Sequence, residues 1–145
     1  MSLEKINIII VDCPKGLAAF RRLLEKQDDI NILAEASNSA DAISLAKKHK
    51  PHIIVLATQM ADKNTYRTAE VLHTELPDVA TLLIAEPGQV ALDLTEGSNL
   101  LLHPFSSVEL RITLRYVFHN IGNRNPKSKI QKRRTQKRFS VVRAA

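Results

Sequence analysis

The sequence contains a single cysteine, Cys13, and no tryptophan. One cysteine cannot form an internal disulfide or a multi-cysteine zinc site, and the five histidines have no spacing that completes a metal site with it. The apolar runs are far shorter than the roughly 18 to 20 residues of a membrane-spanning helix. Residues 1–5 lead directly into a strand-like run, which leaves no room for a signal peptide. We therefore expect a cytoplasmic protein with no metal and no cofactor.

Acidic residues are absent from residue 120 to the C-terminus. Nine of the 21 Lys and Arg residues lie there, so residues 1–119 hold 12 basic and all 15 acidic residues, a net charge of −3. The formal net charge of +6 therefore describes neither part of the chain. We predict a domain over residues 5–119 and a basic tail or linker over 120–145. The densest part of that tail contains Lys127, Lys129, Lys132, Arg133, Arg134, Lys137 and Arg138.

The first 119 residues alternate between short apolar runs and segments with helical spacing of apolar residues. Strands are predicted over 6–11, 30–34, 53–56, 81–85 and 100–102, and helices over 14–24, 39–50, 66–76, 90–95 and 106–118. The last helix begins with a capping box, Ser106 and Glu109. Five apolar strands alternating with five helices predict an α/β domain, a doubly wound parallel sheet with helices on both faces. In such sheets the functional crevice lies at the C-terminal ends of the strands.

Four segments of this pattern resemble the receiver domain of bacterial response regulators, over about residues 5–119. They are Ile8–Asp12, Glu35–Ala42, Pro51–Leu56 followed by Met60, and His103–Phe105. The resemblance implies a flavodoxin-like (βα)5 fold with strand order 2-1-3-4-5. It also implies a cis peptide bond before Pro104 and a role in two-component signalling. An enzyme is not expected, because the sequence has no nucleophile–base pair and no phosphate-cradling glycine loop.

The resemblance also places the family's phosphorylation site on residues that cannot perform its chemistry. Ala57 stands at the position of the phosphoacceptor aspartate, and a methyl group cannot form an acyl phosphate. One acid of the magnesium-binding pair is replaced, and Mg²⁺ requires several oxygen ligands. The degenerate positions are Asp12, Cys13, Ala57, Ala85 and His103, and the aromatic switch position is Leu100. The sequence thus predicts a pseudo-receiver without catalytic residues.

Other chemistry in the same crevice remains open. Thr58 or Asp62 could be a relocated acceptor, Cys13 an oxidant-sensitive thiol near a helix N-terminus, and His103 a pH-responsive group. The alternative in each case is a plain structural replacement. Asp12 is expected to be a helix-capping or turn residue. Three histidines without convergent partners are expected at the surface, namely His52, His73 and His119.

The last predicted helix carries more apolar residues than the sheet needs. Leu110, Leu114 and Val117 form one stripe that should cover the sheet. Receivers commonly pair or dock through the face of the fourth helix, fifth strand and fifth helix, so a surplus of apolar residues there indicates a homodimer or another protein partner. The alternative is that the surplus covers the base of the tail. The interface candidates are Leu92, Leu94, Ile112, Tyr116 and Phe118.

Three interpretations of the tail remain open. In the first, the tail is a disordered end or a linker, as in a receiver fragment of a longer transcriptional regulator. In the second, it binds nucleic acid or an acidic membrane surface. In the third, it becomes ordered on an acidic protein or on a second copy of the chain. No helix-turn-helix pattern follows the domain, so sequence-specific DNA reading is not supported. The leading hypothesis is a phosphorylation-independent signalling module that acts through protein contacts. The alternative is a nucleic-acid-binding regulator that acts through its tail.

Overall fold

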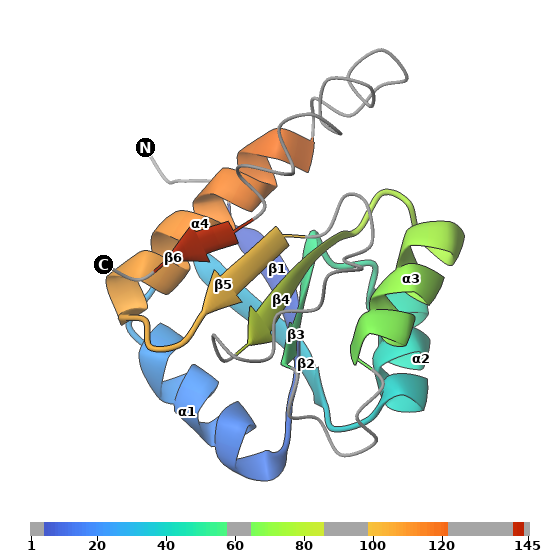
Figure 1. Cartoon of the computed structure of the whole chain (residues 1–145), viewed down its shortest axis with the longest axis horizontal. Coiled ribbons are helices and arrows are strands. Elements are labelled where there is room, and N and C mark those ends of the chain that lie inside the picture. Colours follow the sequence, from blue (N-terminus) through green and yellow to red (C-terminus); the bar gives the residue numbers. More distant parts are fainter. Residues whose placement is uncertain (1–4, 58–64, 86–98, 122–140, 144–145) are drawn as a thin grey trace.

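The computed structural model describes residues 5–57, 65–85, 99–121 and 141–143 (Figure 1). Within these ranges the elements, in chain order, are β1 (Ile6–Val11), α1 (Pro14–Leu24), β2 (Ile30–Ala36), α2 (Ser39–His49), β3 (Ile53–Ala57), α3 (Thr65–Glu75), β4 (Ala80–Ala85), β5 (Asn99–Leu102), α4 (Ser107–Ile121) and β6 (Val141–Arg143). None of the described helices is long and apolar enough to cross a membrane.

The strands form one parallel sheet in the order β2-β1-β3-β4-β5-β6. The first five strands have the predicted flavodoxin-like order. Helices α1 and α4 cover one face of the sheet, and α2 and α3 cover the other (Figure 1). Each face therefore has its own hydrophobic cluster, and the sheet separates the two.

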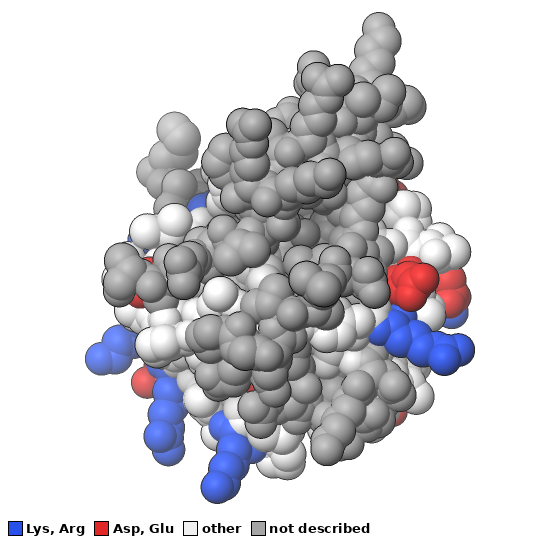
Figure 2. All heavy atoms as spheres, viewed as in Figure 1, with Lys and Arg blue, Asp and Glu red and all other residues white. Residues whose placement is uncertain are grey.

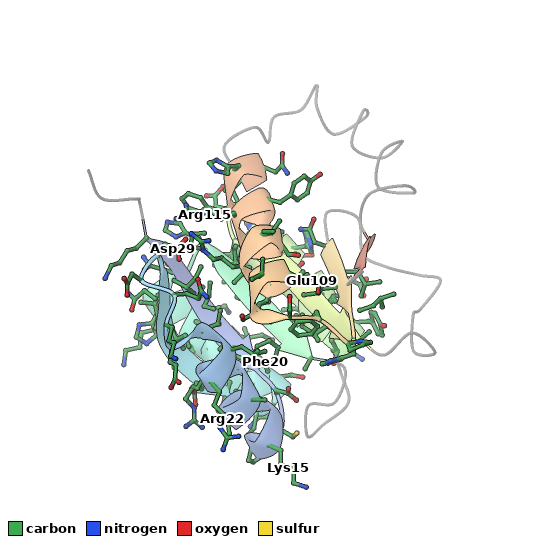
Figure 3. The ribbon with its side chains drawn as sticks, turned by 90° about the vertical axis from the view of Figure 1, so that its left-hand side faces the viewer. Lys15, Phe20, Arg22, Asp29, Glu109 and Arg115 are labelled. Carbon is green, nitrogen blue, oxygen red and sulfur yellow. The ribbon has the colours of Figure 1, made fainter. Side chains whose placement is uncertain are left out.

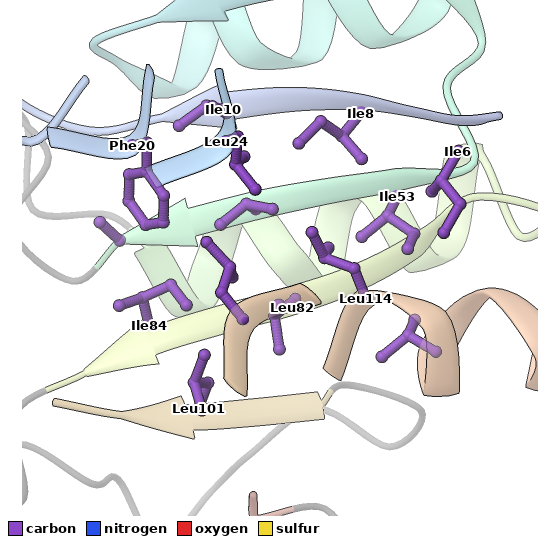
Figure 4. Packing of buried hydrophobic residues seen from close by; sticks show 14 of the residues in the cluster. Ile6, Ile8, Ile10, Phe20, Leu24, Ile53, Leu82, Ile84, Leu101 and Leu114 are labelled. Atoms are coloured by element: carbon purple, nitrogen blue, oxygen red, sulfur yellow. The ribbon is translucent and has the colours of Figure 1, made fainter. Parts of the chain in front are cut away.

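The apolar runs of β1, β3 and β4 are explained by this double covering, because both faces of these strands are buried. Along β1, Ile6, Ile8 and Ile10 pack toward α1 and α4 (Figure 4). Ile9 and Val11 pack in the other cluster, toward α2 and α3. Edge strand β2 is mostly half-buried. The strand predictions are confirmed to within two residues, the largest difference being β2, which extends to Ala36.

Local signals set several helix ends. The Asn38 side chain accepts a hydrogen bond from the Asp41 amide at 2.9 Å, so Asn38 is the N-cap of α2. That helix ends at His49, and its C-cap Lys50 has a left-handed backbone with φ 47° just before Pro51. The predicted capping box is confirmed at the start of α4: the Ser106 amide donates to Glu109, and the Glu109 amide donates to Ser106, both at 3.1 Å.

A charged cluster ties the beginning of β2 to α4. The Asp29 carboxylate is 6% exposed and accepts hydrogen bonds from Arg115 at 2.8 and 3.0 Å and from Arg111 at 3.3 Å (Figure 3). Burial acts to raise its pKa, but the Arg115 hydrogen bonds and the two positive charges outweigh it and hold the pKa of Asp29 below its usual value. The cluster fixes the middle of α4 beside the start of β2.

Two sequence predictions have a different outcome. The short helix expected over residues 90–95 lies outside the described residues. The second difference is strand β6. The sequence predicts only a tail or linker at residues 141–143, whereas these residues pair in parallel with β5. The boundary between residues 119 and 120 stays a prediction.

Candidate functional site

The C-terminal ends of four adjacent strands bring the predicted site positions to one edge of the sheet. The register pairs Val11 with Leu56 and Ala57 with Ile84, and the His103 amide donates to the Ala85 carbonyl at 2.9 Å. Asp12 follows β1, Ala57 and Ala85 end β3 and β4, and His103 follows β5. The topology therefore brings the positions predicted from the resemblance together at one edge of the sheet.

Asp12 is the acidic residue at this edge among the described strand ends, and it is 7% exposed. Its Oδ1 accepts the Cys13 amide hydrogen at 2.6 Å. Burial raises the pKa of its carboxyl group, while the Cys13 hydrogen bond and the charge of His103 partly oppose this rise. A Cβ at Gly16 would overlap this carboxyl group, so only glycine fits there. Asp12 thus packs against the first turn of α1.

The two alanines leave their strand ends without a reactive side chain. Ala57 is 3% exposed and packs in the cluster under α1 and α4, while Ala85 is fully buried on the opposite face. The Ala57 carbonyl accepts a hydrogen bond from the Thr65 hydroxyl at 2.8 Å, which connects β3 to the start of α3. Their side chains belong to the core rather than to a reactive crevice.

Around β5, the predicted switch position Leu100 is fully buried in the cluster under α2 and α3. The His103–Pro104 peptide bond is cis, in agreement with the expectation. The half-buried His103 ring lies 4.9 Å from the Phe105 ring, and Phe105 lies 6.2 Å from Phe20 of α1. His103 therefore has an aromatic neighbour that anchors this turn over α1.

The other candidate groups do not assemble into a reactive centre among the described residues. Cys13 is a half-buried free thiol that precedes α1. Thr58 and Asp62 lie outside the described residues. The described part of the chain contains no group of three or more His, Cys, Asp or Glu side chains that could hold a metal ion. Among the described residues that directly follow these strands, Asp12 therefore supplies the carboxyl group.

The surface prediction for the histidines is wrong for His52. Its Nδ1 accepts the Asn7 amide hydrogen at 2.9 Å, and its ring meets the Phe118 ring edge-on at 4.9 Å. His73 also has a partner, since its Nε2 lies 3.3 Å from the Thr81 hydroxyl. His119 is exposed as predicted. Sequence reasoning missed the His52 contacts because Asn7 lies 45 residues earlier in the chain.

Helix α4 has a buried stripe and an exposed one. Leu110, Leu114 and Val117 are buried against the sheet, as predicted. The exposed large apolar side chains of the described residues all lie on α4 at four-residue spacing: Val108 and Ile112, each 59% exposed, and Tyr116, 48% exposed. We call these three residues the α4 stripe. Sequence reasoning missed Val108, although its spacing from Ile112 could have indicated it.

The remaining interface candidates do not join the α4 stripe. Phe118 is half-buried and packs against the core beside His52. Leu92 and Leu94 lie outside the described residues. Among the described residues, therefore, the large exposed apolar side chains come from α4.

Basic side chains of the described body are dispersed. Figure 2 shows Lys and Arg side chains at separate places around the rim of one face rather than in one patch. Besides Arg111 and Arg115, which pair with Asp29, the basic residues with ion pairs in the described body are Arg21, 2.8 Å from Glu35, and Lys47, 2.6 Å from Glu75. The concentrated positive charge of this chain is therefore a property of the sequence 122–140, whose eight basic residues are accompanied by no acidic one.

No family model matches the sequence. Among curated proteins, the chain is 30% identical over 114 residues to the sensory transduction protein LytT of Bacillus anthracis, covering 76% of this chain and 46% of that protein. Over 73 residues it is 32% identical to a protein-glutamate methylesterase/protein-glutamine glutaminase of Methanospirillum hungatei, covering 50% of this chain and 21% of that one. The chain spans between about a fifth and a half of the length of the curated relatives it matches.

Solved structures give the same result. The signal receiver domain of the putative response regulator NarL from Mycobacterium tuberculosis is 26% identical, with a TM-score of 0.68 over 84% of this chain and all of that one. The signal receiver domain of an HD domain-containing protein from Pseudomonas fluorescens has a TM-score of 0.73 at 16% identity, covering 85% and 93% of the two chains. Fold and sequence similarity thus lead to the same class of domain.

Proposed function

Because the chain carries a response-regulator receiver (CheY-like) domain, we propose that it is a non-enzymatic module of two-component signalling that acts without phosphorylation, through protein contacts. The observation that carries this proposal is the pair of buried methyl groups, Ala57 and Ala85, at the strand ends where the family accepts and binds a phosphoryl group. Neither side chain can bond to or hydrogen-bond a phosphoryl oxygen.

The remaining acid supports the same proposal. A magnesium site needs several oxygen ligands in octahedral geometry, and Asp12 has Cys13 rather than a second acid beside it. One Asp12 oxygen already accepts the Cys13 amide hydrogen, and the carboxyl group lies against Gly16. Its raised pKa reflects the cost of holding a charge at this buried place. Asp12 therefore serves the local fold of β1 and α1.

The proposal is tested by incubating the full chain with acetyl phosphate and Mg²⁺. We expect no phosphoryl group on the protein, measured by intact mass spectrometry, while a receiver with the complete acidic site is labelled under the same conditions. Stable addition of one phosphoryl group to any residue would contradict the proposal. Fragment mass spectra would then show whether Thr58 or Asp62 is the acceptor.

We propose that the contact surface is the α4 stripe and that it associates with a second copy of the chain. Three large apolar side chains on successive helical turns form a continuous surface, and such surfaces on a small domain mark interfaces. A two-fold axis would bring the same stripe of both copies together.

Self-association through the stripe is tested with Ile112→Lys. A charge at the centre of an apolar contact must be desolvated, so we expect the variant to have the monomer mass by light scattering at concentrations where the wild type is a dimer. The matched control is Ser44→Lys, which adds the same charge at an exposed position of α2 on the other face of the sheet. A wild type that stays monomeric at millimolar concentration, or a dimer that survives Ile112→Lys, would refute this surface.

A second candidate function is nucleic-acid binding by residues 122–140, favoured by their eight basic residues. We expect the affinity for a generic DNA duplex, measured by fluorescence anisotropy, to fall steeply with salt, because each neutralised phosphate contributes a slope of about −0.9 in log–log units. Replacing Arg133, Arg134, Lys137 and Arg138 with glutamine should flatten this slope. Equal binding by both proteins, or none at low salt, excludes this function.

A further inference from the structure

The outer edge of β5 is paired with a segment that the rest of the fold does not require. On one side, strand β5 pairs with β4. The pairing begins where Asn99 lies opposite Leu82 and ends where Leu102 lies opposite Ala85. On its other side, Leu100, Leu101 and Leu102 pair with Val141, Val142 and Arg143 of β6. The sheet of five strands is complete without β6, which lies at the end of the strand order (Figure 1).

Alternation along β5 identifies the backbone groups that face β6. The His103 amide donates to Ala85 of β4, and successive residues of a strand direct their backbone groups to opposite sides. The amides and carbonyls of Leu100 and Leu102 therefore face β6. Without a partner these groups form an open strand edge, which is a template for pairing with another extended segment.

Two properties of β6 suit it to reversible pairing. It is three residues long, so few backbone groups pair, and it begins with two β-branched residues, which favour extended backbone. It also runs parallel to β5, which the helical crossover through α4 and residues 122–140 permits. The covalent connection keeps the segment near its edge at an effective concentration in the millimolar range.

We propose that the outer edge of β5 is a docking site for a parallel extended peptide and that the chain's own C-terminal segment is its occupant, docked reversibly in cis. Recognition is by main-chain hydrogen bonds, as in other cases of strand addition to a sheet edge. Docking attaches both ends of residues 122–140 to the domain, and release leaves them attached through α4 alone. The site is independent of the strand ends that carry Ala57 and Ala85.

The test is hydrogen exchange of the full chain, read at the amides of Leu100 and Leu102. Because backbone groups alternate along a strand and Val142 pairs with Leu101, the Val142 amide faces β5. Val142→Pro removes this hydrogen-bond donor and places a proline ring between the two strands. We expect the two amides to exchange at least tenfold faster in this variant, while the amides of β3 are unchanged. Val142→Thr, which keeps the amide and the branched side chain, should exchange like the wild type. A synthetic peptide of residues 139–145, added at millimolar concentration, should restore protection in Val142→Pro, and a scrambled peptide should not.

Three results would overturn the proposal. Equal exchange of Leu100 and Leu102 in the wild type and Val142→Pro would show that the segment does not protect the edge. Failure of the peptide to restore protection would show that the edge is not a docking site. Protection that depends on protein concentration in the wild type would show that the segment comes from a second copy rather than from the same chain.

Discussion

Replacing Ala57 with aspartate is expected to destabilise the domain by about 3 kcal/mol at pH 7 and to leave it unphosphorylated. Ala57 is 3% exposed and packs among apolar side chains, so the new carboxyl group must either lose its charge or be buried with it. On the proposed function, phosphorylation should not return, because the proposal assigns Cys13, Ala85 and His103 to the positions of the other reactive groups. Urea unfolding and acetyl phosphate labelling measure the two effects.

The pH dependence separates charge burial from mere crowding. Burial raises the folded-state pKa of a carboxyl group, so the destabilisation of Ala57→Asp should grow as the pH rises from 4 to 7. Asparagine has almost the same volume as aspartate and no charge. The destabilisation by Ala57→Asn should therefore not change between pH 4 and 7. An aspartate variant as stable as the wild type, or one that takes up phosphate, would mean that the strand end is open and still able to react.

The second large effect is expected at the cluster of Asp29, Arg111 and Arg115. Asp29→Ala should lower the free energy of unfolding by about 2 kcal/mol at pH 7, since it removes charge-assisted hydrogen bonds that reach a buried carboxylate. The loss is smaller than for a fully buried pair because the arginines retain access to water. Arg21→Ala, at the more exposed pair with Glu35, is the control and should change the stability by at most about 0.5 kcal/mol.

The sign of the pH effect at Asp29 is opposite to that at position 57. The folded-state pKa of Asp29 is lowered, so its stabilisation is present above the unfolded-state value near 4 and is lost as the pH falls through the folded-state value. The stability difference between the wild type and Asp29→Asn should therefore be constant from pH 7 to 5 and shrink below pH 4. If the stability difference between the wild type and Asp29→Asn stays the same at pH 2 to 3, it comes from packing rather than from the charge of Asp29.

The elements of the body could be predicted from the sequence because local pattern and tertiary environment agree there. Strand β3 is apolar at every position since both of its faces are covered, and the capping box of α4 is a contact within one helical turn. The resemblance to receivers located Ala57 and Ala85 at the correct strand ends. It could not indicate that both methyl groups are enclosed in the core, which depends on helices on opposite faces of the sheet.

Contacts between distant segments could not be predicted in this way. Strand β6 has three residues and follows a long basic segment, so no periodicity indicates it. Its partner strand lies 41 residues earlier in the chain, since Leu100 pairs with Val141. The same holds for His52, whose hydrogen bond to Asn7 and ring contact with Phe118 join residues from both ends of the domain. Asp29 and Arg115 are separated by 86 positions. Local sequence carries no signal for any of these pairs.

The packing of Asp12 on Gly16 constrains how this chain can diverge. Position 16 accepts no side chain while an aspartate occupies position 12, because a Cβ would overlap the carboxyl group. In related sequences the two positions should therefore change in order: a smaller residue at 12 comes first, and alanine at 16 becomes acceptable only afterwards. The buried acid at the end of β1 can thus persist because its neighbour has adapted to it, without any selection for metal binding.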